Sequence, residues 1–353
     1  MKKLTNKLRR RKTNESEHKR ITNETVAEHR ERVLAGGRRF KYPVQYARHK
    51  LVINASIIGV LALIVLAGTL YWQLYPAQNT STFFYRVTRV LPLPVAVVDG
   101  EPVPYSSYLV GFRSQEHYLQ NKEGVNLNTD QYRSQRDFIK RQALEDAIAD
   151  AYAAKLAREM GISVSDADID AALDRQRESR DGVTSKETYD AIVLDHFNWS
   201  PAEAREVTAA RLLRQEVAYR IDETANKLVK RAQSLVNSDS SFGDIAKSLK
   251  SSGGVDVASG TTPLVPANNQ DGGLAEAASR LSIDQISKPI KSTTGDGYYF
   301  VKLLEKDDKN QVSYEFIKIP LTEFSKRLVD LRQNGLITEY ISVPLPDTTP
   351  NNS

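Results

Sequence analysis

Gly161 to Asp168 reads Gly-Ile-Ser-Val-Ser-Asp-Ala-Asp, and this stretch decides where one predicted helix ends and the next begins. Gly161 follows a long helical pattern and can adopt the left-handed conformation that commonly ends a helix. Ser165, followed by Asp168, has the spacing of an N-cap residue with an acidic residue three positions later. The stretch therefore predicts one helix that ends at Met160 and a second that begins near Ser165.

The helical pattern continues on both sides of this step. Upstream, apolar residues recur at helical spacing between Ser134 and Met160, namely Phe138, Leu144, Ile148, Ala151, Tyr152 and Leu156. Downstream, Thr184 with Glu187 predicts the start of a third helix. Ser200-Pro201-Ala202-Glu203 predicts a fourth, with Ser as N-cap and Pro at the first helical position. Four helices joined by short turns predict a compact helical domain that ends near Ile221.

A β-hairpin is predicted before these helices. Val95–Val98 form an apolar strand, Asp99-Gly100 is a dipeptide typical of tight hairpin turns, and Val103 continues on the far side. Ser106 or Ser107 is the expected cap of the helix that follows. This part of the chain thus combines strands with helices, and we expect the α+β class.

A single membrane-spanning helix is predicted over Leu51–Tyr75. This stretch contains no charged residue, and 25 residues at 1.5 Å each are long enough for a hydrocarbon core of about 30 Å. Tyr71, Trp72 and Tyr75 gather at one end, as in the aromatic belt of a membrane helix. We expect an uncleaved signal-anchor in the cell membrane rather than a cleaved signal peptide.

Charge is distributed unevenly along the 353 residues. Residues 1–50 carry 16 Lys and Arg and five Glu, a net charge of +11, whereas the other residues carry 33 basic and 39 acidic side chains. A basic tail beside a membrane anchor favours the cytoplasmic side and anionic lipid rather than nucleic acid. The expected topology has residues 1–50 in the cytoplasm and everything after Tyr75 outside it.

The composition excludes several kinds of chemistry. The chain has no cysteine, so disulfides, thiol catalysis and a lipidated N-terminal cysteine are excluded. It has no pair of histidines at metal-ligand spacing and no Gly-x-x-x-x-Gly-Lys-Ser/Thr loop, so we expect no metal, no cofactor and no use of ATP. The two histidines after the span, His117 and His196, are isolated and are expected to lie at the surface.

Residues 95–221 resemble the N-terminal chaperone domain of envelope foldases of the SurA, PpiD and PrsA type. The resemblance rests on the valine-rich strand before Asp99-Gly100-Glu101, on the helix before Gly161, and on the closing helix that begins Trp199-Ser-Pro-Ala-Glu203. It implies a chaperone whose partners are unfolded, newly exported polypeptides and, in addition, the secretion machinery.

The segment after residue 221 resembles a parvulin-type prolyl isomerase domain, which such foldases usually carry. The resemblance rests on Phe242-x-x-Ile-Ala246, on Gly272-Gly273, on Ile286-Ser-x-Pro-Ile290 and on Gly297-Tyr-x-x-x-Lys302. It implies a peptide-binding pocket formed by Leu264, Leu274, Ser279, Tyr299 and Phe316, with no catalytic residue assigned.

Two departures from the parvulin pattern bear on activity. Tyr299 stands where the family has a histidine, and the chain has no histidine after residue 196. The family's first strand is also missing, and Gln311–Leu321 either supplies it in permuted order or belongs to the chaperone domain. The stretch Gly295–Leu304 is predicted to be a strand, so Tyr298 and Tyr299 should face opposite sides, one of them inward.

The domain prediction has seven segments. They are a basic tail (1–50), the span (51–75), a linker (76–90), the chaperone domain (91–221), the parvulin-like domain (222–310), a strand-helix-strand segment that returns to the chaperone domain (311–345), and a disordered tail (346–353). A membrane-anchored, ATP-independent holdase is the expected function, with a groove between the two domains as the binding site. The alternatives are a prolyl isomerase of parvulin type with an atypical site that lacks histidine, and an envelope scaffold with one specific partner.

Overall fold

The structure is a computed structural model, and it describes residues 22–126, 129–179, 182–236 and 240–344. The chain divides into two compact units, 1–72 and 73–353. The predicted disordered tail at 346–353 and the first 21 residues of the predicted basic tail lie outside the described residues.

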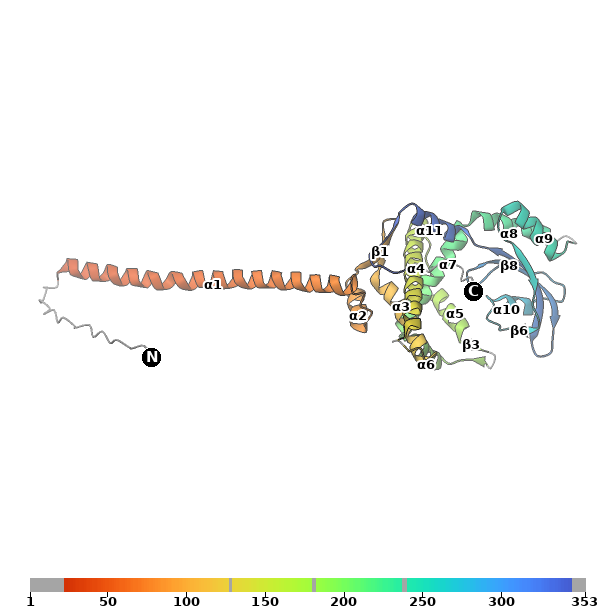
Figure 1. Ribbon diagram of the computed structural model, residues 1–353, viewed down its shortest axis with the longest axis horizontal. Coiled ribbons are helices and arrows are strands. Elements are labelled where there is room, and N and C mark those ends of the chain that lie inside the picture. Colours follow the sequence, from red (N-terminus) through yellow and green to blue (C-terminus); the bar gives the residue numbers. More distant parts are fainter. Residues whose placement is uncertain (1–21, 127–128, 180–181, 237–239, 345–353) are drawn as a thin grey trace. The chain divides into compact units, whose positions relative to one another are not determined.

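The first unit is dominated by one uninterrupted helix, α1 (Asn23–Leu74), whose last two residues belong to the second unit (Figure 1). Within it, His49–Leu74 is long and apolar enough to cross a membrane, and this 26-residue segment overlaps the predicted span almost completely. One candidate span is found among the described residues.

The second unit contains the remaining elements. Its helices are α2 (Thr82–Val90), α3 (Tyr105–Asn121), α4 (Asp130–Met160), α5 (Asp166–Arg177), α6 (Lys186–Phe197), α7 (Pro201–Ile221), α8 (Glu223–Leu235), α9 (Phe242–Gly253), α10 (Leu274–Ser279) and α11 (Glu323–Gln333). Its strands are β1 (Pro94–Val98), β2 (Glu101–Pro104), β3 (Glu178–Ser179), β4 (Gly182–Val183), β5 (Ala258–Thr261), β6 (Val265–Pro266), β7 (Ile290–Lys291), β8 (Gly297–Lys306), β9 (Gln311–Pro320) and β10 (Ile337–Glu339). The predicted α+β class is confirmed.

The helix boundaries follow the capping signals in the sequence. Gly161 has φ +66° and ends α4, because glycine enters the left-handed region without a steric penalty. Ser165 and Asp168 form a reciprocal capping box at α5, and Ser200 and Glu203 form another at α7. The predicted cap of α6 was wrong by one residue, since the hydroxyl of Ser185 accepts the hydrogen bond that starts this helix.

Three other predicted boundaries also differ from the structure. Helix α4 begins at Asp130 instead of Ser134, because Thr129 caps it by accepting from the backbone N–H of Tyr132. Helix α3 begins at Tyr105, directly after Pro104, so neither predicted serine caps it. The predicted linker at 76–90 contains α2, which forms because Tyr85 and Thr88 bury one of its faces.

The predicted hairpin is confirmed and forms part of a three-stranded sheet. Strands β1 and β2 pair antiparallel around Asp99 and Gly100, which both have positive φ as a tight hairpin turn requires. Strand β10 pairs with the other edge of β1, with Ala96 opposite Glu339. Residues from near the end of the chain therefore complete the sheet that its first strands begin, and Phe324 of α11 is buried in the same hydrophobic core as α4.

The second sheet has five strands, in the order β5-β9-β8-β7, with β6 also paired to β9. Side chains alternate along β8, so that Phe300 packs in the core beneath α8 and α9 while Tyr299 and Val301 pack beneath α10. Tyr298 and Tyr299 do face opposite sides, but helices cover both faces. As expected, one of the two, Tyr299, is buried, while Tyr298 is only partly buried.

Strand β9 lies inside this second sheet. It pairs with β8 from Gly297↔Pro320 to Lys306↔Val312, and with β5 on its other edge. The predicted domain boundary between 310 and 311 consequently moves to about Leu321, because separating β9 from β8 would break the centre of the sheet. The alternative in which Gln311–Leu321 supplies a strand in permuted order matches this pairing.

The chain crosses between the helical part and the second sheet twice, and both crossings meet at Asp222. This side chain is 1% exposed. Its Oδ1 accepts from the N–H of Ala225 at 2.8 Å, and its Oδ2 accepts from the N–H groups of Thr322 and Glu323 at 2.7 and 3.1 Å. One carboxylate thus caps α8 on the outgoing crossing and holds the start of α11 on the returning one.

Tyr219 joins the two parts beside Asp222. Its hydroxyl donates to the carbonyl of Gly297 at 2.7 Å, and its ring meets the edge of Tyr298 with centroids 4.9 Å apart. Lys291 also lies 3.1 Å from Glu216 of α7. The end of α7 and the start of β8 are therefore packed and hydrogen-bonded directly to each other.

Candidate functional site

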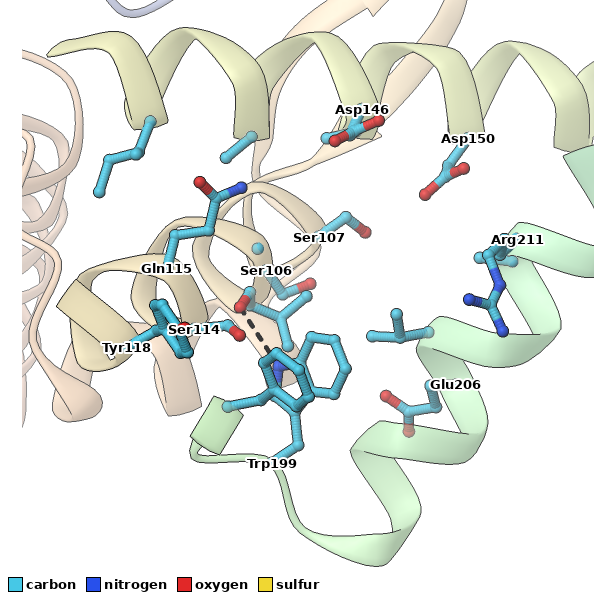
Figure 2. Close-up of a pocket in the computed structure, with 18 of the residues that line it drawn as sticks. Ser106, Ser107, Ser114, Gln115, Tyr118, Asp146, Asp150, Trp199, Glu206 and Arg211 are labelled. Atoms are coloured by element: carbon cyan, nitrogen blue, oxygen red, sulfur yellow. Dashed lines mark hydrogen bonds between the residues drawn. The ribbon is translucent and has the colours of Figure 1, made fainter. Parts of the chain in front are cut away.

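A cavity of about 660 Å³ lies within the helical part, between α3, α4 and α7. Residues from α2 and from the end of α6 complete it. Figure 2 shows Asp146 and Asp150 on α4 on one side, Gln115 and Tyr118 on another, and Glu206 and Arg211 on α7 across the space. Its volume falls within the range of about 300–1,000 Å³ that is typical of ligand pockets.

One wall of the cavity is aromatic and open to solvent. Phe138 is 57% exposed, and Phe197 and Tyr118 are each about two-fifths exposed. Phe197 stacks on Trp199 with ring centroids 5.0 Å apart, and the indole N–H of Trp199 donates to the carbonyl of Val110 at 3.5 Å. These rings are held in place and leave apolar surface in water, so covering them with another apolar group would be favourable.

Small residues create the space in front of these rings. Gly111 on α3 and Ala143 on α4 face each other, and a Cβ atom added at Gly111 would lie 3.5 Å from that of Ala143. Ala147 and Ala210 line the same space from α4 and α7. Gly111 and Ala143 thus let α3 and α4 pack closely where both line the cavity, and the small side chains of Ala147 and Ala210 do not fill the space beside them.

The second wall is polar and uncharged. It consists of Ser106, Ser107, Ser114 and Gln115 on α3 together with Gln135 on α4. Within the part of the chain that the structure describes, none of these five side chains has a hydrogen-bond partner. Hydroxyl and carboxamide groups can both donate and accept, so this wall suits the unpaired N–H and C=O groups of an extended backbone.

Charged residues close one end of the cavity. Arg214 of α7 lies between two carboxylates of α4, 3.1 Å from Asp146 and 3.3 Å from Asp150. Burial raises the pKa of Asp150 to about 6, with the nearby charge of Asp146 adding to the rise and Arg214 opposing it. The Oδ1 atom of Asp150 accepts no hydrogen bond from the described residues, so Arg214 compensates its charge only partly.

The raised pKa of Asp150 predicts a pH-dependent cost to stability. Its folded-state pKa lies above the unfolded value of 3.8, so the charged form costs stability above about pH 6 and that cost is relieved as the pH falls toward 4. Asp150→Asn should therefore be more stable relative to the original chain at pH 7.5 than at pH 4.5. Urea unfolding of both proteins at the two pH values measures this, and an equal difference at both would contradict it.

The five residues predicted to bind peptide lie elsewhere, around the second sheet. Leu274, Tyr299 and Phe316 share one hydrophobic cluster beneath α10, where Leu274 and Tyr299 are buried and Phe316 is partly buried. Leu264 is 39% exposed after β5, and Ser279 ends α10 with its hydroxyl donating to the carbonyl of Glu276. The structure places neither of them in that cluster, and none of the five lines the cavity.

Tyr299 is engaged with neighbouring side chains. Its hydroxyl donates to Oδ2 of Asp296 at 2.7 Å, and Nζ of Lys318 lies 2.5 Å from the same oxygen. Burial alone would raise the pKa of Asp296, but the hydrogen bonds from Lys318, Thr294 and Tyr299 outweigh it and hold this pKa well below its usual value. Burial and the Asp296 carboxylate raise the pKa of Tyr299, so its phenol stays protonated near neutral pH.

The sequence analysis missed the cavity because it placed Phe138 on the buried face of its helix. The periodic pattern does run from Phe138 to Leu156, and Leu144 and Ile148 are indeed buried. Phe138, in contrast, is exposed and lines the cavity. The available signal in the sequence was the pair of closely spaced aromatic residues at the end of a helix, Phe197 and Trp199.

The helical part, with its cavity, matches a known family of domains. Residues 46–218 fit the family model described as the SurA-like N-terminal domain. These residues form a SurA-like N-terminal domain. This match extends from within α1 to near the end of α7, so it includes every residue that lines the cavity.

Comparison with other proteins adds one similar solved structure. It comes from work on PEB4 and the periplasmic protein Cj1289, described as structurally related SurA-like chaperones of Campylobacter jejuni. The alignment covers 69% of this chain and 93% of that chain, with 14% identity and a TM-score of 0.23. With a TM-score this low, the match carries no structural argument. No curated protein matches the sequence of this chain.

Proposed function

We propose that this protein is a membrane-anchored, ATP-independent extracytoplasmic chaperone that holds segments of unfolded, newly exported polypeptides in the cavity between α3, α4 and α7. The SurA-like domain supports a chaperone function. The observation that carries the more specific proposal is that one cavity is lined both by exposed aromatic rings and by hydrogen-bonding groups that have no partner among the described residues.

The two walls suit the two properties that distinguish an unfolded chain from a folded one. An unfolded segment exposes apolar side chains, which can cover the rings of Phe138, Phe197 and Trp199. It also exposes backbone N–H and C=O groups, which can pair with Gln115 and Gln135. Neither wall requires a particular side chain at a particular position, so the cavity would accept many sequences.

Anchoring and energy supply complete the proposal. The candidate span at His49–Leu74 and the basic residues before it support a single-pass anchor with the folded unit outside the cytoplasm. Tethering would raise the local concentration of the chaperone where chains leave the export site. Binding and release would depend on client affinity alone, because the chain has no phosphate-binding loop of the kind used with ATP.

The binding site proposed here replaces the expected groove between the two parts of the molecule. The described cavity is lined only by residues between Tyr85 and Arg214. The second sheet, which we propose to be parvulin-like with β9 in permuted order, is joined to the helical part through Asp222 and Tyr219. In this proposal it supports the helical domain instead of forming half of the site.

A prolyl isomerase that uses Tyr299 has no support in the geometry. The phenol would need to reach a bound proline, yet its side chain is 7% exposed and its hydroxyl already donates to Asp296. We propose that this domain does not act through Tyr299. A proline-limited refolding assay tests this, with Tyr299→Phe expected to leave the rate unchanged.

Phe138→Ala is the most direct test of the cavity. Phe138 is largely exposed, so its removal should change stability little, while binding of an unfolded peptide should weaken by about 1–2 kcal/mol, or roughly five- to thirtyfold. Fluorescence anisotropy with a labelled, permanently unfolded exported protein measures the affinity of the full chain in detergent.

Ile283→Ala is the matched control, because Ile283 is also exposed and apolar, at 63%, but lies after α10 and away from the cavity. Equal affinities for the two variants would contradict binding in the cavity. Retention of a single partner by crosslinking in cells, in place of many clients, would instead favour a scaffold.

A further inference from the structure

Helix α2 carries an exposed apolar stripe. Phe83 is 65% exposed and Val90 is 80% exposed, and the two lie seven residues apart on one face of the helix. Leu91, directly after the helix, is 45% exposed. Apolar side chains this exposed on a short helix cost free energy in water, and the cost is removed if another apolar phase covers them.

The opposite face of α2 fixes this orientation. Tyr85 and Thr88 are buried, and the hydroxyl of Tyr85 donates to Glu203 of α7 at 2.6 Å. Arg113 of α3 donates to the hydroxyl of Thr82 at 2.7 Å. Helix α2 is therefore docked on α3 and α7, and the stripe formed by Phe83, Val90 and Leu91 cannot turn inward without breaking these contacts.

The chain folds back so that α2 starts beside the end of the candidate span. The N–H of Asn79 donates to the carbonyl of Gln73 at 2.8 Å, and the Asn79 carboxamide donates to the Gln73 side chain at 3.0 Å. Asn79 also accepts from the N–H of Ser81, the residue that precedes α2. Phe83 thus follows, by four residues, an asparagine that is hydrogen-bonded to Gln73, the next-to-last residue of the candidate span.

The end of the span is itself held by the folded unit. Leu74 is fully buried, and the hydroxyl of Tyr105 donates to its carbonyl at 2.6 Å. Tyr75 donates to the carbonyl of Pro94 at 2.8 Å. Leu74, the last residue of the candidate span, therefore belongs to the same folded unit as α2, so chain connectivity keeps residues 73–91 within a few residues of the proposed anchor.

The charge on this surface suits a lipid headgroup. Arg86 lies three residues after Phe83 on the exposed side of α2. Among the described residues it has no ion-pair or hydrogen-bond partner, whereas Arg89 is paired with Glu206 at 2.6 Å. A guanidinium group binds phosphate through two parallel hydrogen bonds, so Arg86 can serve an anionic headgroup while Phe83 and Val90 enter the apolar boundary below it.

We propose that the stripe of Phe83, Arg86, Val90 and Leu91 lies in the headgroup region of the membrane and binds anionic lipid. The proposal rests on the anchor proposed above. Its consequence concerns the cavity, because Tyr85 and Arg89 on the same helix line it. Lipid contact would hold one wall of the client-binding cavity at the membrane surface, where exported chains emerge.

The absence of native cysteine allows a direct test with the full chain. Single cysteines are introduced by Phe83→Cys, Val90→Cys, Ile58→Cys and Val183→Cys, and each is labelled with a small fluorophore. The proteins are reconstituted in vesicles of phosphatidylcholine with or without phosphatidylglycerol. Quenching by lipids spin-labelled at the headgroup or in the acyl chain is compared with quenching by aqueous iodide.

We expect labels at 83 and 90 to be quenched at least threefold more by headgroup spin labels than the label at 183, which is an exposed position on β4. This difference should grow with phosphatidylglycerol and shrink in Arg86→Gln. Equal quenching at 83, 90 and 183 would overturn the inference. A second outcome would also overturn the inference. If the labels at 83 and 90 are shielded from iodide in native membranes but are not quenched by lipid in vesicles, the stripe contacts another protein instead of lipid.

The label at Ile58 separates this inference from the anchor. Ile58 lies within the candidate span and should be quenched by acyl-chain spin labels. If it is quenched while 83 and 90 are not, the anchor stands and the surface contact of α2 is wrong. If Ile58 is not quenched, the anchor fails, and the lipid contact of α2 fails with it.

Discussion

Asp222→Ala is expected to lower the free energy of unfolding by about 3–5 kcal/mol. The substitution removes the acceptor for three backbone N–H groups, those of Ala225, Thr322 and Glu323. Each buried donor left without a partner costs about 1–3 kcal/mol, and water that enters the gap recovers part of the sum. A loss of this size would exceed that of most single substitutions, because one carboxylate holds both chain crossings.

The measurement is urea unfolding in detergent of the full chain carrying Trp72→Phe, which leaves Trp199 as its one tryptophan, followed by fluorescence and by circular dichroism. Trp199 reports on the helical part, whereas circular dichroism also reports on the second sheet. Since Asp222 connects the two, the transitions seen by the two probes should coincide in the original protein and separate in Asp222→Ala. If the two transitions coincide in Asp222→Ala and the free energy of unfolding falls by less than about 1 kcal/mol, the connection between the helical part and the second sheet does not depend on this residue.

Asp222→Asn is the matched control. The carboxamide keeps one oxygen, which can still accept from Ala225 or from the pair at Thr322 and Glu323. Its NH₂ group is a donor, so it cannot accept from the remaining N–H groups that face it. The expected loss is therefore intermediate. A loss as small as that of an exposed substitution would indicate that water replaces the missing acceptor without cost.

Local features of this fold could be predicted from the sequence because their causes lie within a few residues. The left-handed glycine at 161 and the capping boxes at Ser165 and Ser200 depend on neighbours no more than three positions away. The turn at Asp99-Gly100 likewise needs only two residues with positive φ. The structure confirms each of these features.

The contacts of Asp222 that join the helical part to the second sheet could not be predicted, and neither could the cavity, because each depends on residues far apart in the chain. Asp222 could be recognised as a cap for the helix after it, but its contacts with Thr322 and Glu323 span about a hundred positions. Phe138 fits the periodicity of a buried face, and only the packing of α7 against α4 determines that a hollow remains in front of it. Helical periodicity identifies an apolar face but not whether another element covers it.

Gly297→Ala is the second substitution with a large expected effect. Gly297 begins β8 with φ +156°, and a Cβ atom there would lie 2.4 Å from the carbonyl oxygen of Ile319 and 3.0 Å from Cα of Pro320. Both atoms belong to the backbone of β9, so no side-chain movement can relieve the contact. Strands β8 and β9 would have to separate at Gly297, where the carbonyl also accepts from Tyr219.

The expected cost of Gly297→Ala is about 3 kcal/mol or more, as for other substitutions that force a packed backbone apart. Gly161→Ala is the matched control. Gly161 has φ +66° but nothing within 4 Å of an added Cβ, so only the left-handed strain of about 1 kcal/mol remains. Urea unfolding of the two variants separates close approach from backbone strain, and equal losses would mean that β9 moves away from residue 297 without cost.

The Tyr219 contact at the same point predicts a further readout. Because the second sheet and α7 meet at Gly297, its substitution should lower the urea midpoint of the Trp199 signal as well, whereas damage confined to the second sheet would leave that midpoint in place.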